Sequence, residues 1–184
     1  MNTRSHQKHE TRRRIVSAAR KAIRDQGLIA PSVQGVMGEA GLTVGGFYAH
    51  FENRDALMLE ALGEQMNERM DELRALIPST TASERRELTA RYYLSRKHRD
   101  GGVDRCPLPA VLSEIGKAPA PFRELLEAHL RTWSDAMRDG NDPEGRDKAL
   151  AAIATMVGAL TIARALGATP FSDDVLRAAK AAVA

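Results

Sequence analysis

Apolar side chains recur every three or four residues along most of this chain of 184 residues, a spacing typical of amphipathic helices. The first such stretch covers residues 11–26. Its apolar positions are spaced i, i+3, i+4, i+7 and i+8, so they share one stripe of a helix: Ile15, Ala18, Ala19, Ala22 and Ile23. Gly27 follows directly as a residue that ends helices. The pattern therefore predicts a first helix over residues 11–26.

Two short helices are predicted next, and each begins after a residue that favours helix N-termini. Ser32 is expected to cap a helix over residues 33–40, which Gly41 ends. Thr43 is expected to cap a second helix over residues 44–51. Two short helices joined by a turn that contains glycine match the helix-turn-helix pattern.

Two adjacent glycines, Gly45 and Gly46, lie inside the second of these short helices. Each glycine in a helix interior costs about 1 kcal/mol relative to alanine. Glycines on the exposed face of a recognition helix would let its backbone approach DNA closely. Tyr48 and His50 could reach phosphates, and Phe47 or Phe51 could anchor the helix. The alternative is that this stretch is a loop whose aromatic residues are core.

Six further helices are predicted from the same spacing in the rest of the chain. They cover residues 54–77, 84–98, 106–116, 121–138, 146–166 and 172–184. Asn53 and Ser172 are the expected caps of the first and last of them. No repeat and no strand of consequence is predicted, so the expected fold class is all-α with about nine helices.

The composition fits a soluble helical protein, with 43% hydrophobic, 28% charged and only 4% aromatic residues. The single cysteine, Cys106, excludes an internal disulfide framework and a cysteine-rich zinc site, so we expect a reducing cytoplasm. The polar, basic start does not resemble a secretory signal. The longest uncharged stretch, residues 149–163, is too short to span a membrane.

Basic residues are concentrated at the N-terminal end. Residues 1–55 hold nine lysines and arginines against five acidic residues, whereas the remaining residues hold 18 basic and 19 acidic ones. A basic N-terminal segment, residues 1–55 (the basic head), on an otherwise nearly neutral chain suggests that this segment binds a polyanion. A solvated N-terminal tail would have the same charge, so charge alone leaves both interpretations open.

The run TRRRIVSAARKAIRDQGLIAPSVQGVMGEAGLTVGGFYAHFENRDALMLEAL, residues 11–62, resembles the N-terminal DNA-binding domain of the TetR family of bacterial transcriptional regulators. The resemblance is carried by Ile15, Ala18, Ala19, Gly27, Ser32, Val33, Ala40, Gly41, Leu42, Tyr48, His50, Phe51, Ala56 and Leu57. It implies an all-helical homodimer with a helix-turn-helix DNA-binding domain, residues 1–55, and a helical ligand-binding and dimerisation domain, residues 56–184. The segment Val36-Met37-Gly38 departs from the family's usual Ile-Ala pairing.

The resemblance also implies which residues touch DNA, and the implied partner is a palindromic double-stranded operator. Base or phosphate contacts are implied for Thr43, Val44, Gly45 and Gly46, and phosphate contacts for Ser32, Gln34, Tyr48 and His50. Family members usually have lysine where this chain has Arg54, which keeps the positive charge at the start of the next helix.

The last two predicted helices are expected to form a four-helix bundle with a second copy of the chain, because residues 146–166 are apolar on more than one face. A fully buried helix of a monomer is the alternative. A pocket for a small-molecule inducer is expected between the central helices. Its candidate lining residues are Tyr92 or Tyr93, Cys106, Leu112, His129, Trp133 and Met156. For each residue alone, ordinary core packing is the simpler interpretation.

Cys106 has a second possible role. It precedes Pro107 at a predicted helix N-terminus and follows Arg105, and a helix dipole with nearby cations lowers the pKa of a thiol. That would suit a sensor of oxidants or electrophiles. A buried small hydrophobic residue is the competing interpretation.

The sequence thus predicts a ligand-responsive transcriptional regulator, with repression as the expected direction, that an inducer releases from its operator. The alternative is a regulator that switches through oxidation of Cys106. An enzyme is not expected, because the chain has no Glu-x-x-His pair, glycine-rich phosphate loop or His/Cys metal spacing. Neither a cofactor nor a metal is expected.

Overall fold

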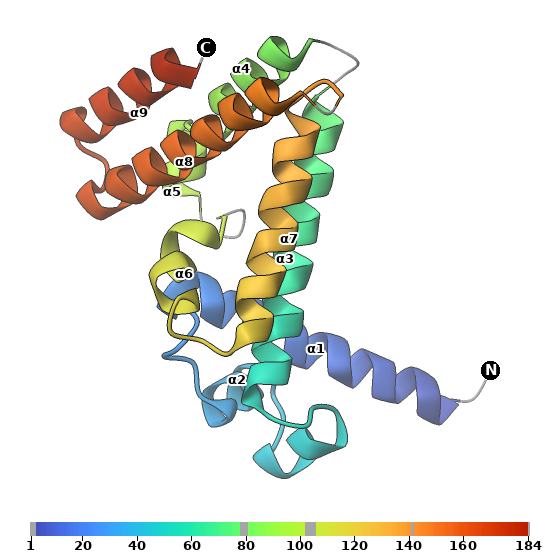
Figure 1. Cartoon of the computed structure of the whole chain (residues 1–184). Coiled ribbons are helices and arrows are strands. Elements are labelled where there is room, and N and C mark those ends of the chain that lie inside the picture. The colour runs from blue at the N-terminus through green and yellow to red at the C-terminus, as the bar shows by residue number, and fades with distance from the viewer. Residues whose placement is uncertain (1–2, 78–80, 102–105, 141, 184) are drawn as a thin grey trace. The chain divides into compact units, whose positions relative to one another are not determined.

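The computed structural model describes residues 3–77, 81–101, 106–140 and 142–183. Within these residues it contains nine α-helices, one 3-10 helix and no strand (Figure 1), so the expected all-α class is confirmed. The helices are α1 (Thr3–Gln26), α2 (Val33–Glu39), the 3-10 helix η1 (Val44–Ala49), α3 (Arg54–Leu76), α4 (Ala82–Tyr93), α5 (Arg96–Asp100), α6 (Leu108–Ile115), α7 (Ala120–Ala136), α8 (Pro143–Leu166) and α9 (Pro170–Val183).

The chain forms two compact units. The N-terminal unit comprises Met1–Met66 and Ala110–Leu125, and the C-terminal unit comprises Asn67–Pro109 and Leu126–Ala184. The boundary between them falls within α3, α6 and α7.

In the N-terminal unit, α1 packs against α2, and α2 packs against η1. The apolar stripe expected on the first helix faces inward, since Ile15, Ala19 and Ile23 are fully buried. The other helices complete this core with Val36 and Met37 from α2, Phe47 from η1, and Leu57, Met58, Ala61 and Leu62 from α3. These side chains hold the two short helices against the longer ones.

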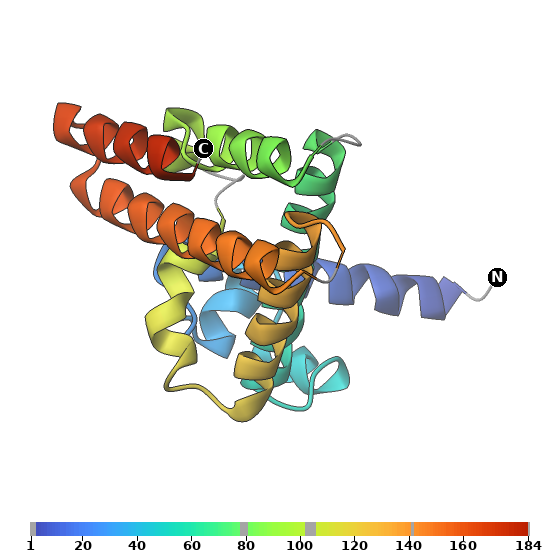
Figure 2. The same cartoon turned by 45° about the horizontal axis from the view of Figure 1, so that its top comes forward.

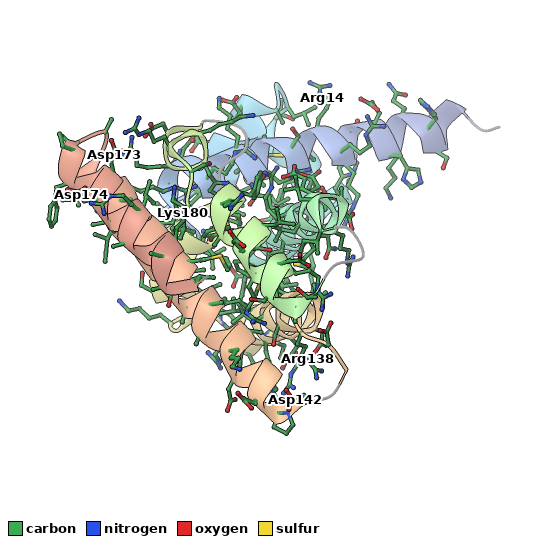
Figure 3. The ribbon with its side chains drawn as sticks, turned by 90° about the horizontal axis from the view of Figure 1, so that it is seen from above. Arg14, Arg138, Asp142, Asp173, Asp174 and Lys180 are labelled. Atoms are coloured by element: carbon green, nitrogen blue, oxygen red, sulfur yellow. The ribbon has the colours of Figure 1, made fainter. Side chains whose placement is uncertain are left out.

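In the C-terminal unit, α8 packs along α9, and α4 packs against both (Figures 1 and 2). By length and composition α8 is apolar enough to cross a membrane, but eight of its residues are buried within the unit, as in a core helix. The short helix α5 is tied to the start of α9 by Arg99, whose Nη1 donates to Ser172 Oγ and to Asp173 Oδ1, both at 2.9 Å. Figure 3 shows Asp173 at that end of α9.

Two boundaries of the N-terminal unit differ from the expectation. Helix α1 begins at Thr3 rather than at Thr11, because residues 3–10 contain neither glycine nor proline to stop it. The second short helix is a 3-10 helix, and Thr43 makes no side-chain capping hydrogen bond. Ser32 and Asn53 do cap as expected: Ser32 Oγ accepts from Gly35 N at 3.0 Å, and Asn53 Oδ1 accepts from Ala56 N at 2.9 Å.

Boundaries of the C-terminal unit differ as well: α4 begins at Ala82 rather than at residue 84, and α8 begins at Pro143 rather than at residue 146. The single helix expected over residues 84–98 is two helices, since Ser95 Oγ accepts from His98 N at 3.1 Å and starts α5. The last helix begins at Pro170, and Thr169 Oγ1 accepts from Ser172 N at 3.1 Å. Ser172 is therefore not the cap; it is fully buried and donates to Ala163 O at 3.0 Å.

Candidate nucleic-acid interface and buried aromatic cluster

The helices α2 and η1 are joined by a tight turn at Gly41. Gly41 has a φ of +66°, a conformation that side chains with a Cβ rarely adopt, and a Cβ there would lie 3.2 Å from Arg14 Nη2. The N–H of Leu42 donates back to Met37 O at 2.9 Å, which closes the end of α2. The helix-turn-helix expected from the sequence is therefore present.

The short helix η1 is anchored on one side and open on the other. Phe47 is fully buried, stacks on Phe51 with ring centroids 5.7 Å apart, and meets the edge of Tyr48 at 5.2 Å. By contrast, Val44 is 43% exposed and Tyr48 is 72% exposed. The neighbouring candidates Thr43, Gly45 and Gly46 are exposed too. Five of the candidate DNA contacts thus lie together on one accessible segment.

The glycine pair has no internal role in this structure. A Cβ built on Gly45 meets no atom of the described chain within 4 Å, and one on Gly46 meets only Met37 Cε, at 4.0 Å. Neither glycine has a positive φ. The fold would accept side chains at both positions, so packing and backbone strain do not explain why the chain has glycine there.

Arg54 lies differently from the other candidates. Its guanidinium donates to the carbonyl oxygens of Pro31 at 2.7 Å, of Ile29 at 2.8 Å and of Leu28, and forms an ion pair with Asp55 at 3.1 Å. Arg54 thus braces the connection between α1 and α2. Glu114 of α6 holds the same connection from its other side by accepting from Leu28 N.

The remaining N-terminal candidates are accessible in different degrees. Ser32 and Gln34 are exposed, although the Ser32 hydroxyl is also the cap of α2. His50 is half-buried, and its Nδ1 is buried without a hydrogen-bond partner among the described residues. Burial, with the charges of Lys8 and Arg12, lowers the pKa of His50, which favours a neutral imidazole.

In the C-terminal unit, three of the inducer candidates are linked through Tyr93. The Tyr93 hydroxyl donates to Cys106 Sγ at 3.2 Å, and its ring lies 5.3 Å from that of Trp133. The Trp133 ring lies 6.2 Å from His129. We call these four residues, Tyr93, Cys106, His129 and Trp133, the aromatic cluster; all are at least nine-tenths buried.

The other inducer candidates are placed elsewhere. Met156 is fully buried on α8, and Leu112 is half-buried on the part of α6 that belongs to the N-terminal unit. The Tyr92 hydroxyl bonds outside the cluster, to Glu72 Oε2 at 2.9 Å, whereas its ring, like that of Tyr93, lies against His98. Tyr92 lines an open groove of about 450 Å³ together with Leu76, Lys97 and His98, among others. The sequence did not distinguish Tyr92 from Tyr93, because the two residues are adjacent on one helix and only the packing shows which side chain points into the core.

Burial decides the protonation of the aromatic cluster. It raises the pKa of Tyr93 and of Cys106, and it lowers the pKa of His129 from 6.5 to about 4. The expected lowering of the Cys106 pKa is wrong, because desolvation outweighs the Tyr93 hydrogen bond and the charges of Arg164 and Arg69. At neutral pH the cluster is therefore uncharged.

One donor of the cluster is unused. Trp133 Nε1 is buried and has no hydrogen-bond partner within the part of the chain that the structure describes, and the same holds for Ser134 Oγ beside it. An unpaired buried donor usually costs about 1–3 kcal/mol. In the described ranges no group of three or more histidine, cysteine or acidic residues could hold a metal ion.

Comparisons with known proteins agree with this geometry. Residues 15–61 match the family described as bacterial regulatory proteins, tetR family. No curated protein matches the sequence at significant similarity.

Among solved structures, E. coli NemR in its reduced form is 19% identical with a TM-score of 0.79, and the match covers 95% of each chain. A TetR-family regulator from Cytophaga hutchinsonii is 21% identical with a TM-score of 0.76, over 96% of this chain and 94% of that one. FadR from Bacillus subtilis, solved with stearoyl-CoA, is 14% identical with a TM-score of 0.66, over 93% of this chain and 96% of that one. At these identities the likeness shows the fold.

Proposed function

Residues 15–61 belong to the tetR family of bacterial regulatory proteins and the chain has the fold of TetR-family transcriptional regulators, and from this premise we propose that it binds a palindromic DNA operator as a homodimer. A small-molecule inducer releases it, so that it acts as a ligand-responsive repressor in the cytoplasm and catalyses no reaction. The DNA-binding domain is residues 1–55, and the ligand-binding and dimerisation domain is residues 56–184.

The observation that carries the proposal is the open glycine pair of η1. Gly45 and Gly46 weaken a helix and serve no packing need, so their use lies outside the chain. A backbone without side chains at these positions can approach the floor of a major groove. Thr43 and Val44 then face base edges, while Tyr48, His50, Ser32 and Gln34 are the proposed phosphate contacts. Arg54 braces the connection between α1 and α2, and its proposed part in DNA binding is the positive charge that it adds at the start of α3.

The homodimer is supported by exposed apolar side chains on α8 and α9. Ile162 is 52% exposed, Leu166 40% and Phe171 66%, and apolar surface of this kind is usually covered by a partner. We propose that the two copies of η1 in this dimer enter successive major grooves of the operator, roughly 34–36 Å apart.

The aromatic cluster is the proposed inducer site, together with Tyr92 and Met156 of the same unit. Its uncharged state and the free donors of Trp133 and Ser134 suit a ligand that brings an apolar body and a hydrogen-bond acceptor. FadR from Bacillus subtilis, solved with stearoyl-CoA, is a precedent for a ligand within this fold. Trp133 is the only tryptophan, so its fluorescence reports ligand entry directly.

A thiol switch at Cys106 is the second candidate, favoured by one contact. The Tyr93 hydroxyl donates to Cys106 Sγ, and such a bond stabilises a thiolate once it forms. NemR, solved in its reduced form, is a precedent for a protein of this fold whose redox state is distinguished. Replacing Cys106 by serine separates the candidates: release from DNA by oxidants should be lost under thiol sensing, and release by small molecules should persist under inducer binding.

The proposed function is tested by measuring affinity for a palindromic duplex from upstream of the protein's own gene and for a random duplex of equal length. Across a series of salt concentrations we expect the palindrome to bind about a thousandfold more tightly, with affinity for both falling as salt rises. Equal affinity for the two duplexes would reject sequence-specific regulation.

A further inference from the structure

Three consecutive arginines, Arg12, Arg13 and Arg14, form the most basic part of α1, yet the structure uses them differently. Arg14 Nη2 donates to Ala40 O at 2.6 Å, at the C-terminal end of α2 (Arg14 is labelled in Figure 3). Arg12 Nη1 donates to His50 O, at the C-terminal end of η1. The side chain of Arg13 is 79% exposed, and among the described residues its one partner is Glu10, in an ion pair at 3.5 Å.

Arg12 makes the most complete set of contacts of the three. Its Nε donates to Glu60 Oε1 at 3.1 Å and its Nη2 to Glu60 Oε2, so the guanidinium and the carboxylate pair in a bidentate fork. Its Cζ also lies 4.1 Å from the centre of the Phe51 ring. Both charged side chains are about two-thirds buried, at 37% and 33% exposed. Bidentate charge-assisted pairs fix geometry as well as energy.

Apart from the buried ring of Phe51, which stacks on Phe47, the end that Arg12 holds has little local support. Helix η1 is a 3-10 helix, whose hydrogen bonds are poorer than those of an α-helix, and Thr43 does not cap its start. After Ala49 the chain leaves through His50 and Phe51, whose N–H groups both donate to Phe47 O. A cation on the His50 carbonyl also complements the negative end of a helix.

We propose that Arg12 is a positioning residue for DNA binding: with Glu60 it fixes the C-terminal end of η1 and so orients the glycine face, while Arg13 supplies the phosphate contact. The proposal rests on the proposed function. It reverses the simplest interpretation of the basic head, in which every arginine of the triplet touches phosphate. It also assigns an acidic residue of α3, Glu60, to DNA binding.

Salt dependence distinguishes a positioning arginine from a phosphate contact. A cation on a phosphate releases a counterion, so its loss reduces the slope of log affinity against log salt by about one. Loss of a positioning contact weakens binding without changing that slope. We therefore expect Arg12→Gln to reduce operator affinity about tenfold to a hundredfold at unchanged slope, and Arg13→Gln to reduce the slope by about one.

Glu60→Gln gives the sharpest distinction. If Glu60 merely restrained a phosphate-binding Arg12, removing the carboxylate charge would strengthen operator binding and steepen the salt dependence. The proposal predicts the reverse: Glu60→Gln weakens binding like Arg12→Gln. Arg12→Lys should also weaken binding, because lysine keeps the charge but cannot form the fork. Unchanged or tighter binding by Glu60→Gln overturns the proposal.

Amide hydrogen exchange in the DNA-free protein tests the same role independently of any operator. The amides of His50 and Phe51 should exchange about tenfold faster in Arg12→Gln, and at the wild-type rate in the matched control Arg13→Gln. Equal rates in the two variants would contradict the positioning role even if DNA binding is never observed. Conversely, if the wild-type protein shows no preference for a palindromic duplex, the proposed function is rejected. The hydrogen-exchange measurement still decides the role of Arg12.

Discussion

The exposed helix η1 and the buried aromatic cluster contribute to the stability of the fold in opposite ways. In η1, Gly45 and Gly46 occupy positions where the fold would accept a side chain, so the chain loses helix stability there. In the aromatic cluster, Tyr93 and Trp133 fill the interior, and any ligand role they have coincides with their core role. A residue whose type is unfavourable for the fold is therefore easier to assign to function than one that the fold itself needs.

The largest effect expected is in the buried region. Trp133→Ala should lower the free energy of unfolding by about 3–5 kcal/mol, because it removes the largest fully buried side chain of the C-terminal unit. Denaturant unfolding followed by circular dichroism measures this. Trp133→Phe is the matched control and should cost less, since it keeps a ring and removes the unpaired Nε1 donor. A loss below about 1 kcal/mol for Trp133→Ala would show that the cluster is not core.

The pH dependence of stability should come next, through His129. Burial lowers its pKa from 6.5 to about 4, so between these values the unfolded chain binds more protons than the folded one. The contribution of His129 to the free energy of unfolding is then fully present above about pH 6.5. It is lost as the pH drops towards 4, by on the order of 3 kcal/mol at most. Thermal unfolding across this pH range should show a flatter profile for His129→Leu. A variant with the wild-type slope would mean that His129 does not titrate in this way.

In the exposed region, Gly45→Leu should change binding and spare the fold. We expect operator affinity to fall about a hundredfold or more, since a side chain would separate the helix backbone from the groove. The thermal midpoint should not fall below the wild-type value and the oligomeric state should not change, because the site is open. Fluorescence anisotropy with labelled operator measures the affinity. Tight binding by this variant would show that the glycine face does not meet DNA.

The smallest expected effect is a gain in stability, whereas the substitutions in the aromatic cluster are expected to reduce it. Gly45→Ala should raise the free energy of unfolding by about 0.4–1 kcal/mol, because it restricts the unfolded chain at a position with no positive φ. Gly41→Ala is the contrasting control and should destabilise, since Gly41 has a φ of +66°. If both variants destabilise equally, the glycine pair has a packing role that the open surface does not reveal.

Local patterns sufficed for much of the N-terminal unit. The stripe of α1, the Ser32 and Asn53 caps and the Gly41 turn all follow from residues within a few positions of one another. Thr43 shows the limit, because its residue type suits a cap but the tight 3-10 geometry leaves its side chain unused. Periodicity predicts that a helix forms, and it does not determine the type of its first turn.

Contacts between distant residues could not be predicted from the sequence alone. Arg12 meets Glu60 across 48 positions and Leu28 meets Glu114 across 86, and no local signal pairs them. The prediction of a lowered pKa for Cys106 was wrong for the same reason. The nearby cations are visible in the sequence, whereas the burial that outweighs them is a property of the packed unit.

Methylation protection tests the central claim, that η1 lies in the major groove, most directly. Guanine N7 faces the major groove, so an operator with guanines in both half-sites records where the protein sits. We expect two protected patches centred about 10–10.5 base pairs apart for the wild type, and none for Gly45→Leu at the same concentration. Protection confined to adenine N3 in the minor groove, or equal protection by the two proteins, would contradict the account.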